Sequence, residues 1–171
     1  MKDVSDKNFG VIIAFLLPGF LFLWGLSYSS TDIATWLARS TADHAPTVGG
    51  FLYATLASLA IGLLISAVRW LVIDHIHEWT GVPYPDLNFT NLKDKDRYAA
   101  FVGAVENHFR YYQYYSNTLI SAICAFICYL CTKGNPSLKI WVATIAITIA
   151  LFLGSRDALK KYYDRAKAIL S

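Results

Sequence analysis

Apolar residues in this chain are gathered into four long runs and do not alternate regularly with polar residues. The runs cover about residues 10–28, 51–73, 116–131 and 138–154. A helix needs about 20 apolar residues to cross a hydrocarbon core about 30 Å thick. The last two runs are shorter, which a bilayer accommodates by thinning or through flanking interfacial residues. The pattern therefore predicts an all-α fold, an integral membrane four-helix bundle that occupies residues 1–171 as a single domain.

The residues between and within the runs predict how these helices are joined. The pair Pro18-Gly19 should kink the first helix, because proline lacks a backbone donor. The next connection should begin with a short interfacial helix, capped by Thr31 or Asp32. A tight turn at Gly134-Asn135-Pro136 makes the third and fourth helices antiparallel neighbours.

The connection between the second and third runs, residues 74–115, has the most individual sequence. Its first part, residues 74–91, contains the helix breakers Gly81, Pro83 and Pro85 and should be irregular. A helix should then begin near residues 91–93 and continue without a break into the third run. We therefore expect the third helix to extend into the cytoplasm as a stalk.

Composition and charge support insertion in a membrane and set the orientation. Hydrophobic residues make up 56% of the chain and charged residues 16%, whereas soluble domains have roughly 45–50% and about 25%. Most Lys and Arg residues lie before the first run, between residues 69 and 110, or in the tail 155–171. Basic residues favour the cytoplasmic side, so both termini should be cytoplasmic in a multi-pass protein of the bacterial inner membrane.

The net charge of +3 is small and follows this topology, so we predict no nucleic-acid partner. The tail 155–171 is basic and amphipathic. Its apolar side can face lipid or the stalk, while anionic lipid head groups attract its basic residues by about 1 kcal/mol each. Membrane lipid is therefore an expected partner.

One face of the third helix carries most of that helix's polar and polarisable groups. At about 100° per residue these side chains fall within an arc of roughly 80°. We call them the polar stripe: Glu106, Arg110, Gln113, Asn117, Ser121, Cys124 and Cys128. Polar residues in a membrane face the bundle interior or a water-filled cavity. The stripe thus either forms hydrogen bonds between helices or lines a conduction path.

The second run carries a face of small residues. Ser58, Gly62 and Ser66 are spaced four residues apart, a pattern that lets two helices approach closely. The sequence leaves open whether the partner helix belongs to this chain or to another subunit.

A cytoplasmic collar of polar residues follows the second run, and it consists of Arg69, Asp74, His75, His77 and Glu78. Histidines and acids are the ligands of catalytic zinc sites, so a membrane-embedded metal-dependent hydrolase is one alternative. On a helix, however, side chains two residues apart diverge by about 200°. No HExxH motif or nucleophile motif occurs. We therefore assign no catalytic residue, metal or cofactor.

Three segments resemble uncharacterised small bacterial four-helix membrane proteins: Leu17–Phe20, Ser66–Trp70 and Val105–Tyr115. The resemblance covers most of the chain but attaches to no known activity. Proteins of this size and architecture often serve as membrane subunits or effectors of anti-phage defence systems, and the resemblance implies such a role here.

These features together predict a non-enzymatic subunit of the inner membrane that assembles with copies of itself. It would act as a membrane sensor or effector, or as a gated pore. A passive anchor that holds a cytoplasmic protein partner through residues 74–97 is a further alternative.

Overall fold

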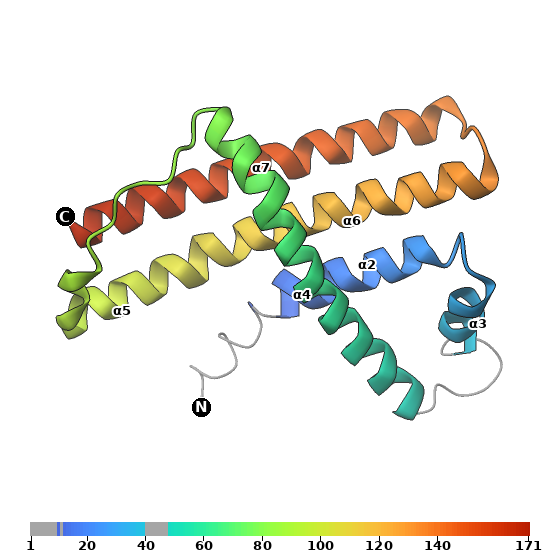
Figure 1. The fold of residues 1–171 in the computed structure, drawn as a ribbon, viewed down its shortest axis with the longest axis horizontal. Helices are drawn as coiled ribbons and strands as arrows, with labels where there is room; N and C mark the ends of the chain where they lie inside the picture. The colour runs from blue at the N-terminus through green and yellow to red at the C-terminus, as the bar shows by residue number, and fades with distance from the viewer. Residues whose placement is uncertain (1–9, 11, 40–47) are drawn as a thin grey trace.

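The computed structural model describes residues 10, 12–39 and 48–171, and this part of the chain is almost entirely helical (Figure 1). The described part contains no β-strand, which confirms the predicted all-α class. In chain order the elements are the π-helix η1 (Ile12–Leu16), α2 (Leu17–Leu26), α3 (Thr31–Arg39), α4 (Val48–Trp79), the 3₁₀-helix η2 (Phe89–Lys93), α5 (Lys95–Ala104), the π-helix η3 (Val105–Phe109), α6 (Arg110–Lys133) and α7 (Leu138–Leu170).

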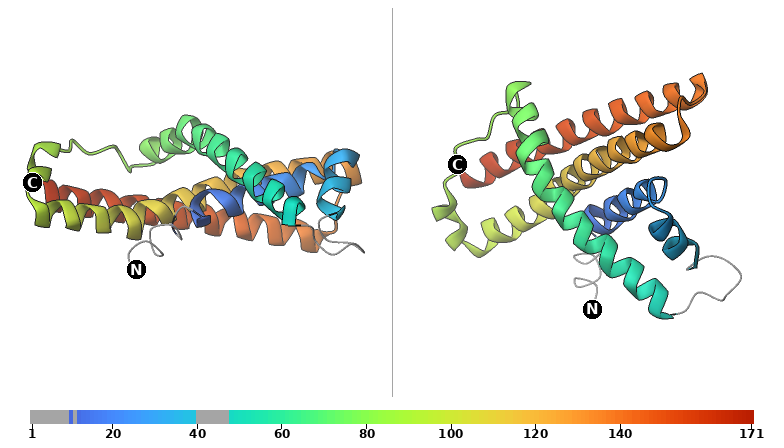
Figure 2. Two further views of the ribbon diagram at one scale, coloured as in Figure 1. Left: turned by 90° about the horizontal axis from the view of Figure 1, so that it is seen from below. Right: turned by 45° about the vertical axis from the view of Figure 1, so that its right-hand side comes forward.

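Helices α5, η3 and α6 form one rod, and α7 returns antiparallel beside it (Figure 1). The rod has 39 residues, so it is about 58 Å long at 1.5 Å per residue. Figure 2 shows α4 crossing this hairpin obliquely, and α2 packs against both α4 and α6. The predicted continuous rod is therefore present, and we keep the name stalk for its part made of α5 and η3. The π-turn η3 interrupts the regular α-helix that we expected there.

Three helices are long and apolar enough to cross a membrane: Gly50–Trp79, Lys95–Lys133 and Leu138–Leu170. The fourth predicted span forms a shorter apolar helix, Ile12–Leu26. It ends early because the chain turns at residues 27–29 and then starts α3 at Thr31, where the interfacial helix was predicted. The basic N-terminal tail before residue 10, on which the predicted orientation partly rests, lies outside the described residues.

Glycines bring α2 and η1 into close contact with α4. A Cβ atom on Gly62 would lie less than 3.0 Å from the Phe15 carbonyl oxygen. A Cβ atom on Gly19 would lie equally close to the carbonyl oxygen of Ser58, whose own side chain is buried. The face that includes Ser58 and Gly62 therefore packs against a helix of the same chain, while Ser66 is half-buried.

The half of the hairpin that contains α5 and the end of α7 has a small core of its own. Val82, Ala158 and Leu159 are buried there, with Tyr162 and other aromatic side chains packed around them. The Asn91 side-chain amide donates a hydrogen bond to the Leu170 carbonyl at 2.8 Å and so caps the end of α7. The apolar side of the tail 155–171 thus faces the stalk.

Candidate functional site

Polar side chains from three helices, some fully buried and some half-buried, meet near the end of α4. We call this group the polar junction; it comprises Arg69, Asp74 and His77 of α4, Tyr112 of α6, and Ser155 and Arg156 of α7. His77, Tyr112 and Ser155 are fully buried, and Arg69 is 6% exposed. Buried polar groups are costly unless they are paired, so their concentration at one level of the bundle marks the candidate site.

Arg69, Asp74 and Tyr112 form the charged half of the junction. Arg69 Nη1 lies 3.6 Å from Asp74 Oδ1, and the Tyr112 hydroxyl donates a short hydrogen bond to the same carboxylate oxygen. The Arg69 guanidinium also lies 4.9 Å from the centre of the Tyr112 ring, a cation–π geometry. Within the described residues, Arg69 Nε and Nη1 have no hydrogen-bond partner. The nearby Asp74 carboxylate is therefore the main compensation for the buried Arg69 charge.

His77 and Ser155 form the neutral half. The Ser155 hydroxyl donates to the Phe152 carbonyl at 2.8 Å, so the Ser155 oxygen accepts the bond from His77 Nε2 at 2.9 Å. His77 lies four residues beyond the apolar run 51–73. The Arg156 guanidinium disfavours a positive charge on the His77 ring, whereas the Asp74 carboxylate favours it. The hydrogen-bond partners place a hydrogen on Nε2 of the ring.

The last carbonyl groups of α4 and the turn after it accept hydrogen bonds from the following backbone and from α7. Val82 N–H donates to the His77 carbonyl at 2.9 Å, and Gly81 takes a φ of +93°, which favours glycine. Arg156 Nη2 donates to the Thr80 carbonyl at 2.5 Å. Two hydrogen bonds thus join the end of α4 to α7, one at His77 and one at Thr80.

The polar stripe packs inside the bundle next to this junction. Asn117 is fully buried, and its side-chain amide donates to the Ala14 carbonyl at 2.8 Å. In an unbroken α-helix the N–H of residue 18 would bind that carbonyl, but Pro18 has none. Asn117 therefore supplies a donor to a carbonyl within the π-turn η1, whose regular α-helical partner would be the missing N–H of Pro18.

The other stripe residues extend this contact in both directions. Gln113 and Ser121 are buried, and Cys124 and Cys128 are half-buried free thiols. Arg110 donates to Gln113 at 3.1 Å. Glu106 Oε2 would lie 3.2 Å from a Cβ atom on Gly10, so Glu106 lies beside the start of the first helix. Among the hydrogen bonds of the described stripe residues, the bond from Asn117 to Ala14 joins two helices, whereas those of Arg110 and Ser121 lie within α6.

The collar residues separate into an inner and an outer set because α4 is helical at this point. Arg69, Asp74 and His77 face the junction, whereas His75 and Glu78 are exposed. In the part of the chain that the structure describes, no three His, Cys, Asp or Glu residues are placed to hold a metal ion. A metal-dependent hydrolase would require His75, His77 and an acid to converge, and the described residues do not place them together.

Sequence reasoning missed Tyr112, Ser155 and Arg156 as members of the junction. Ser155 is 78 residues from its partner His77. Tyr112 lies in an aromatic cluster with three other tyrosines, Tyr111, Tyr114 and Tyr115, and no local pattern distinguishes it. The only available signal was the position of Ser155-Arg156 at the end of the fourth apolar run.

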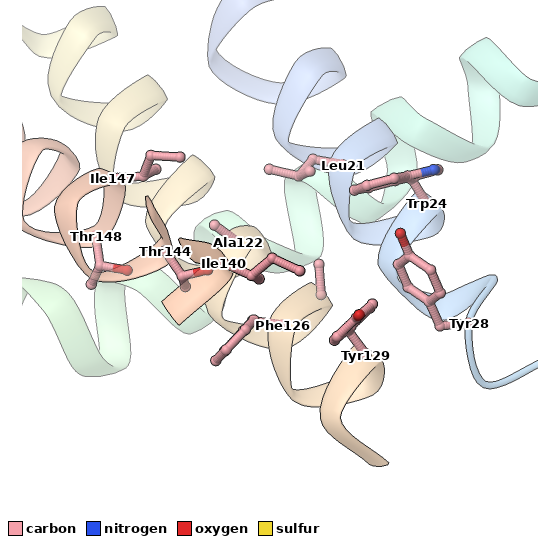
Figure 3. Close-up of a pocket in the computed structure, with 11 residues that line it drawn as sticks. Leu21, Trp24, Tyr28, Ala122, Phe126, Tyr129, Ile140, Thr144, Ile147 and Thr148 are labelled. Carbon is pink, nitrogen blue, oxygen red and sulfur yellow. The ribbon is translucent and has the colours of Figure 1, made fainter. Parts of the chain in front are cut away.

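A groove of about 320 Å³ lies between α2, α6 and α7, at the end of the bundle opposite the stalk. Figure 3 shows Leu21 and Trp24 of α2, and Tyr28 of the turn that follows, facing Ile140 and Thr144 of α7 across it. A Cβ atom on Gly25 would lie less than 3.0 Å from Ala125, so α2 is held tightly against α6. No charged residue is among the described residues that line the groove. It is thus an apolar, lipid-type surface, and the polar chemistry lies at the junction.

No family model, curated protein or solved structure matches this chain. The function must therefore be argued from the geometry of the chain itself.

Proposed function

We propose that this chain is an integral protein of the bacterial inner membrane that crosses the bilayer four times, with both termini in the cytoplasm. The three long apolar helices support this proposal, and Ile12–Leu26 supplies the fourth crossing by packing against α4 and α6. Large apolar side chains remain exposed along α4 and α7, as lipid-facing surfaces require. The end of α2, the start of α4 and the α6–α7 turn all lie at the end of the molecule opposite the stalk (Figure 1).

The function that this geometry favours is a non-enzymatic sensor or effector that couples the cytoplasmic stalk to the membrane helices. The polar junction carries the proposal. It joins α4 to α6 and α7 at the level where both hairpin helices leave the apolar region. A displacement of α7 at Ser155 and Arg156 would act directly on α4, and α4 is packed against the first helix through Gly62. Packed elements of this kind change between discrete arrangements.

The gated-pore form of this proposal assigns a closed state to the present structure, because the first helix covers the stripe at Asn117. Opening would require that helix to leave Ala14 and expose the stripe to water. Asn117 Oδ1, Ser116 Oγ and Ser58 Oγ are buried and lack hydrogen-bond partners among the described residues, so water would stabilise the open state. Assembly with copies of itself and a role in anti-phage defence are further parts of the proposal, and they rest on architecture alone.

The proposed topology predicts which positions a membrane-impermeant maleimide can label in intact cells. In a background with the three native cysteines changed to alanine, Asn135→Cys should label in intact cells. Lys160→Cys should label only after the membrane is permeabilised, because positive residues stay in the cytoplasm. Both positions are exposed, so access depends on the membrane alone. The reverse labelling pattern, or extraction of the chain by alkaline carbonate, would contradict the proposal.

The pore form predicts ion flux from liposomes when the junction is weakened. Arg156→Ala removes the bond to Thr80; a loss of about 1.4 kcal/mol would raise the open fraction, and hence the flux, about tenfold. Adding Asn117→Leu or Glu106→Ala should lower that flux, because the path would lose polar lining. Asn107→Leu, at an exposed stalk position, is the matched control and should leave it unchanged.

The same assay separates the pore from the passive anchor. If neither the parent chain nor Arg156→Ala conducts, or if Asn117→Leu and Glu106→Ala both leave the flux unchanged, the pore form is wrong. Co-purification of a cytoplasmic protein that is lost when residues 74–97 are replaced would then favour the anchor.

A further inference from the structure

The environment of His77 is built for a neutral imidazole and has no place for a second proton. Nε2 donates to Ser155, whose own hydrogen is directed to Phe152. The His77 ring stacks on the Phe152 ring with 5.1 Å between the ring centroids. The Tyr112 ring packs edge-on against it with 6.0 Å between the centroids. Nδ1 is buried and has no hydrogen-bond partner within the described ranges. A proton on Nδ1 would create a buried charged donor without an acceptor, which is strongly unfavourable.

The charged groups around the ring do not compensate for such a proton. From α7, the Arg156 guanidinium faces His77 and repels a positive ring. From α4, Asp74 attracts it, but that carboxylate already faces Arg69 and accepts a hydrogen bond from Tyr112. Tyr163 of α7 also faces Asp74 and contributes no charge while its phenol is protonated. The balance therefore favours expulsion of a protonated ring from the junction.

Expulsion of the ring would separate two helices at once. The His77–Ser155 and Thr80–Arg156 hydrogen bonds lie within one turn of each other at the end of α4. A ring that moves to water breaks the first bond directly and moves the Thr80 carbonyl away from Arg156. We propose that His77 is a proton-sensitive latch that releases the end of α4 from α7 when the cytoplasmic side becomes acidic. The effect of this release on the membrane rests on the proposed function, whereas the latch itself does not.

The sign of the pH dependence follows from the neutral state of the ring. The ordinary pKa of histidine is about 6.5, and the folded junction favours the neutral form. The latch is therefore fully stable above about pH 6.5 and loses stability as the pH falls below that value, because the released ring binds the proton more readily.

The test measures the distance between α4 and α7 by double electron–electron resonance in phosphatidylethanolamine–phosphatidylglycerol nanodiscs. Spin labels are placed at Trp79→Cys and Lys167→Cys, both exposed positions, with the native cysteines changed to alanine. Between about pH 7.5 and about pH 5, the mean distance should change by about 5 Å, one helical turn. His77→Gln keeps a donor for Ser155 but cannot titrate, so the change should disappear. His75→Gln, at the exposed neighbouring histidine, should retain it.

Two results would overturn the proposal: an unchanged distance in the parent chain, or an equal change in His77→Gln. If His77→Gln fails to fold, ¹⁵N NMR of the parent imidazole gives an independent test. At about pH 7.5 it should show hydrogen on Nε2 and none on Nδ1, and the opposite tautomer contradicts the latch. Neither measurement depends on ion flux. If the distance between α4 and α7 changes with pH but the chain never conducts ions, the pore proposal is wrong and the latch proposal stands.

Discussion

Replacing Gly62 with alanine should destabilise the protein by about 1–3 kcal/mol, even though alanine is the better helix former. The added Cβ atom would lie less than 3.0 Å from the carbonyl oxygen of Phe15. A backbone carbonyl cannot rotate away as a flexible side chain can, so the first helix and α4 must move apart and lose packing. Gly19→Ala should have a similar effect through the Ser58 carbonyl. The free energy of unfolding, measured by steric trapping in detergent micelles, checks this.

Gly103 provides a matched control, because a Cβ atom there would meet no other atom within 4 Å. Gly103→Ala should stabilise the chain by up to about 1 kcal/mol through helix propensity alone. The two glycine-to-alanine changes are therefore predicted to have opposite signs. A stabilising effect at Gly62 would show that the first helix does not pack on α4 as described.

Replacing Asp74 with asparagine should cost about 3 kcal/mol of unfolding free energy. The amide keeps an acceptor for the Tyr112 hydroxyl but leaves the Arg69 charge unpaired, with only 7% of the Arg69 side chain exposed. Breaking one partner of a buried pair typically costs about 3–5 kcal/mol. The lower end applies here because 32% of the Asp74 side chain is exposed and solvent screens the pair. Equilibrium unfolding in detergent micelles measures the loss.

A double mutant and a surface pair test the cause of this loss. Arg69→Met combined with Asp74→Asn should recover most of the stability, because no buried charge remains. Asp157→Asn removes the ion pair with Lys161, whose N–O distance of 2.6 Å is shorter than the 3.6 Å between Arg69 and Asp74. The side chains of Asp157 and Lys161 are, however, 63% and 58% exposed. Its loss should cost less than about 0.5 kcal/mol. Equal losses at Asp74 and Asp157 would contradict the importance of burial.

Local pattern predicted most of the helices correctly. The breakers Gly81 and Pro83 fall in the irregular connection after α4, but α4 continues to Trp79, six residues into the segment 74–91 that was expected to be irregular, because Asp74 and His77 bind α6 and α7. The predicted helix start near residues 91–93 is the separate 3₁₀-helix η2, and α5 begins at Lys95. Asp94 caps α5 by accepting a hydrogen bond from Asp96 N–H at 2.9 Å. The long helix through the third run was also predicted. The π-turns η1 and η3 were not, because a π-turn adds one residue per turn only where tertiary contacts stabilise it. The proline at position 18 was the one sign of irregularity in the first helix.

The candidate site was predicted only in part. The collar identified Arg69, Asp74 and His77, and the divergence of His75 from His77 followed from helical geometry. Which of the two histidines faces inward was not predictable, since both have polar and aromatic neighbours in the sequence. Ser155 and Arg156 became visible only when α7 was seen against the end of α4.

The sequence by itself determined that the chain is helical, where its long apolar helices lie and where the basic residues gather, because helix length, hydropathy and turn signals are properties of short segments. Only the tertiary structure decided that the small residues Ser58 and Gly62 meet the first helix of the same chain, that Asn117 donates to the Ala14 carbonyl, and that His77 contacts Ser155. These contacts join residues 39 or more positions apart. Their choice depends on which helix faces are buried together, and periodicity along the chain does not encode that choice.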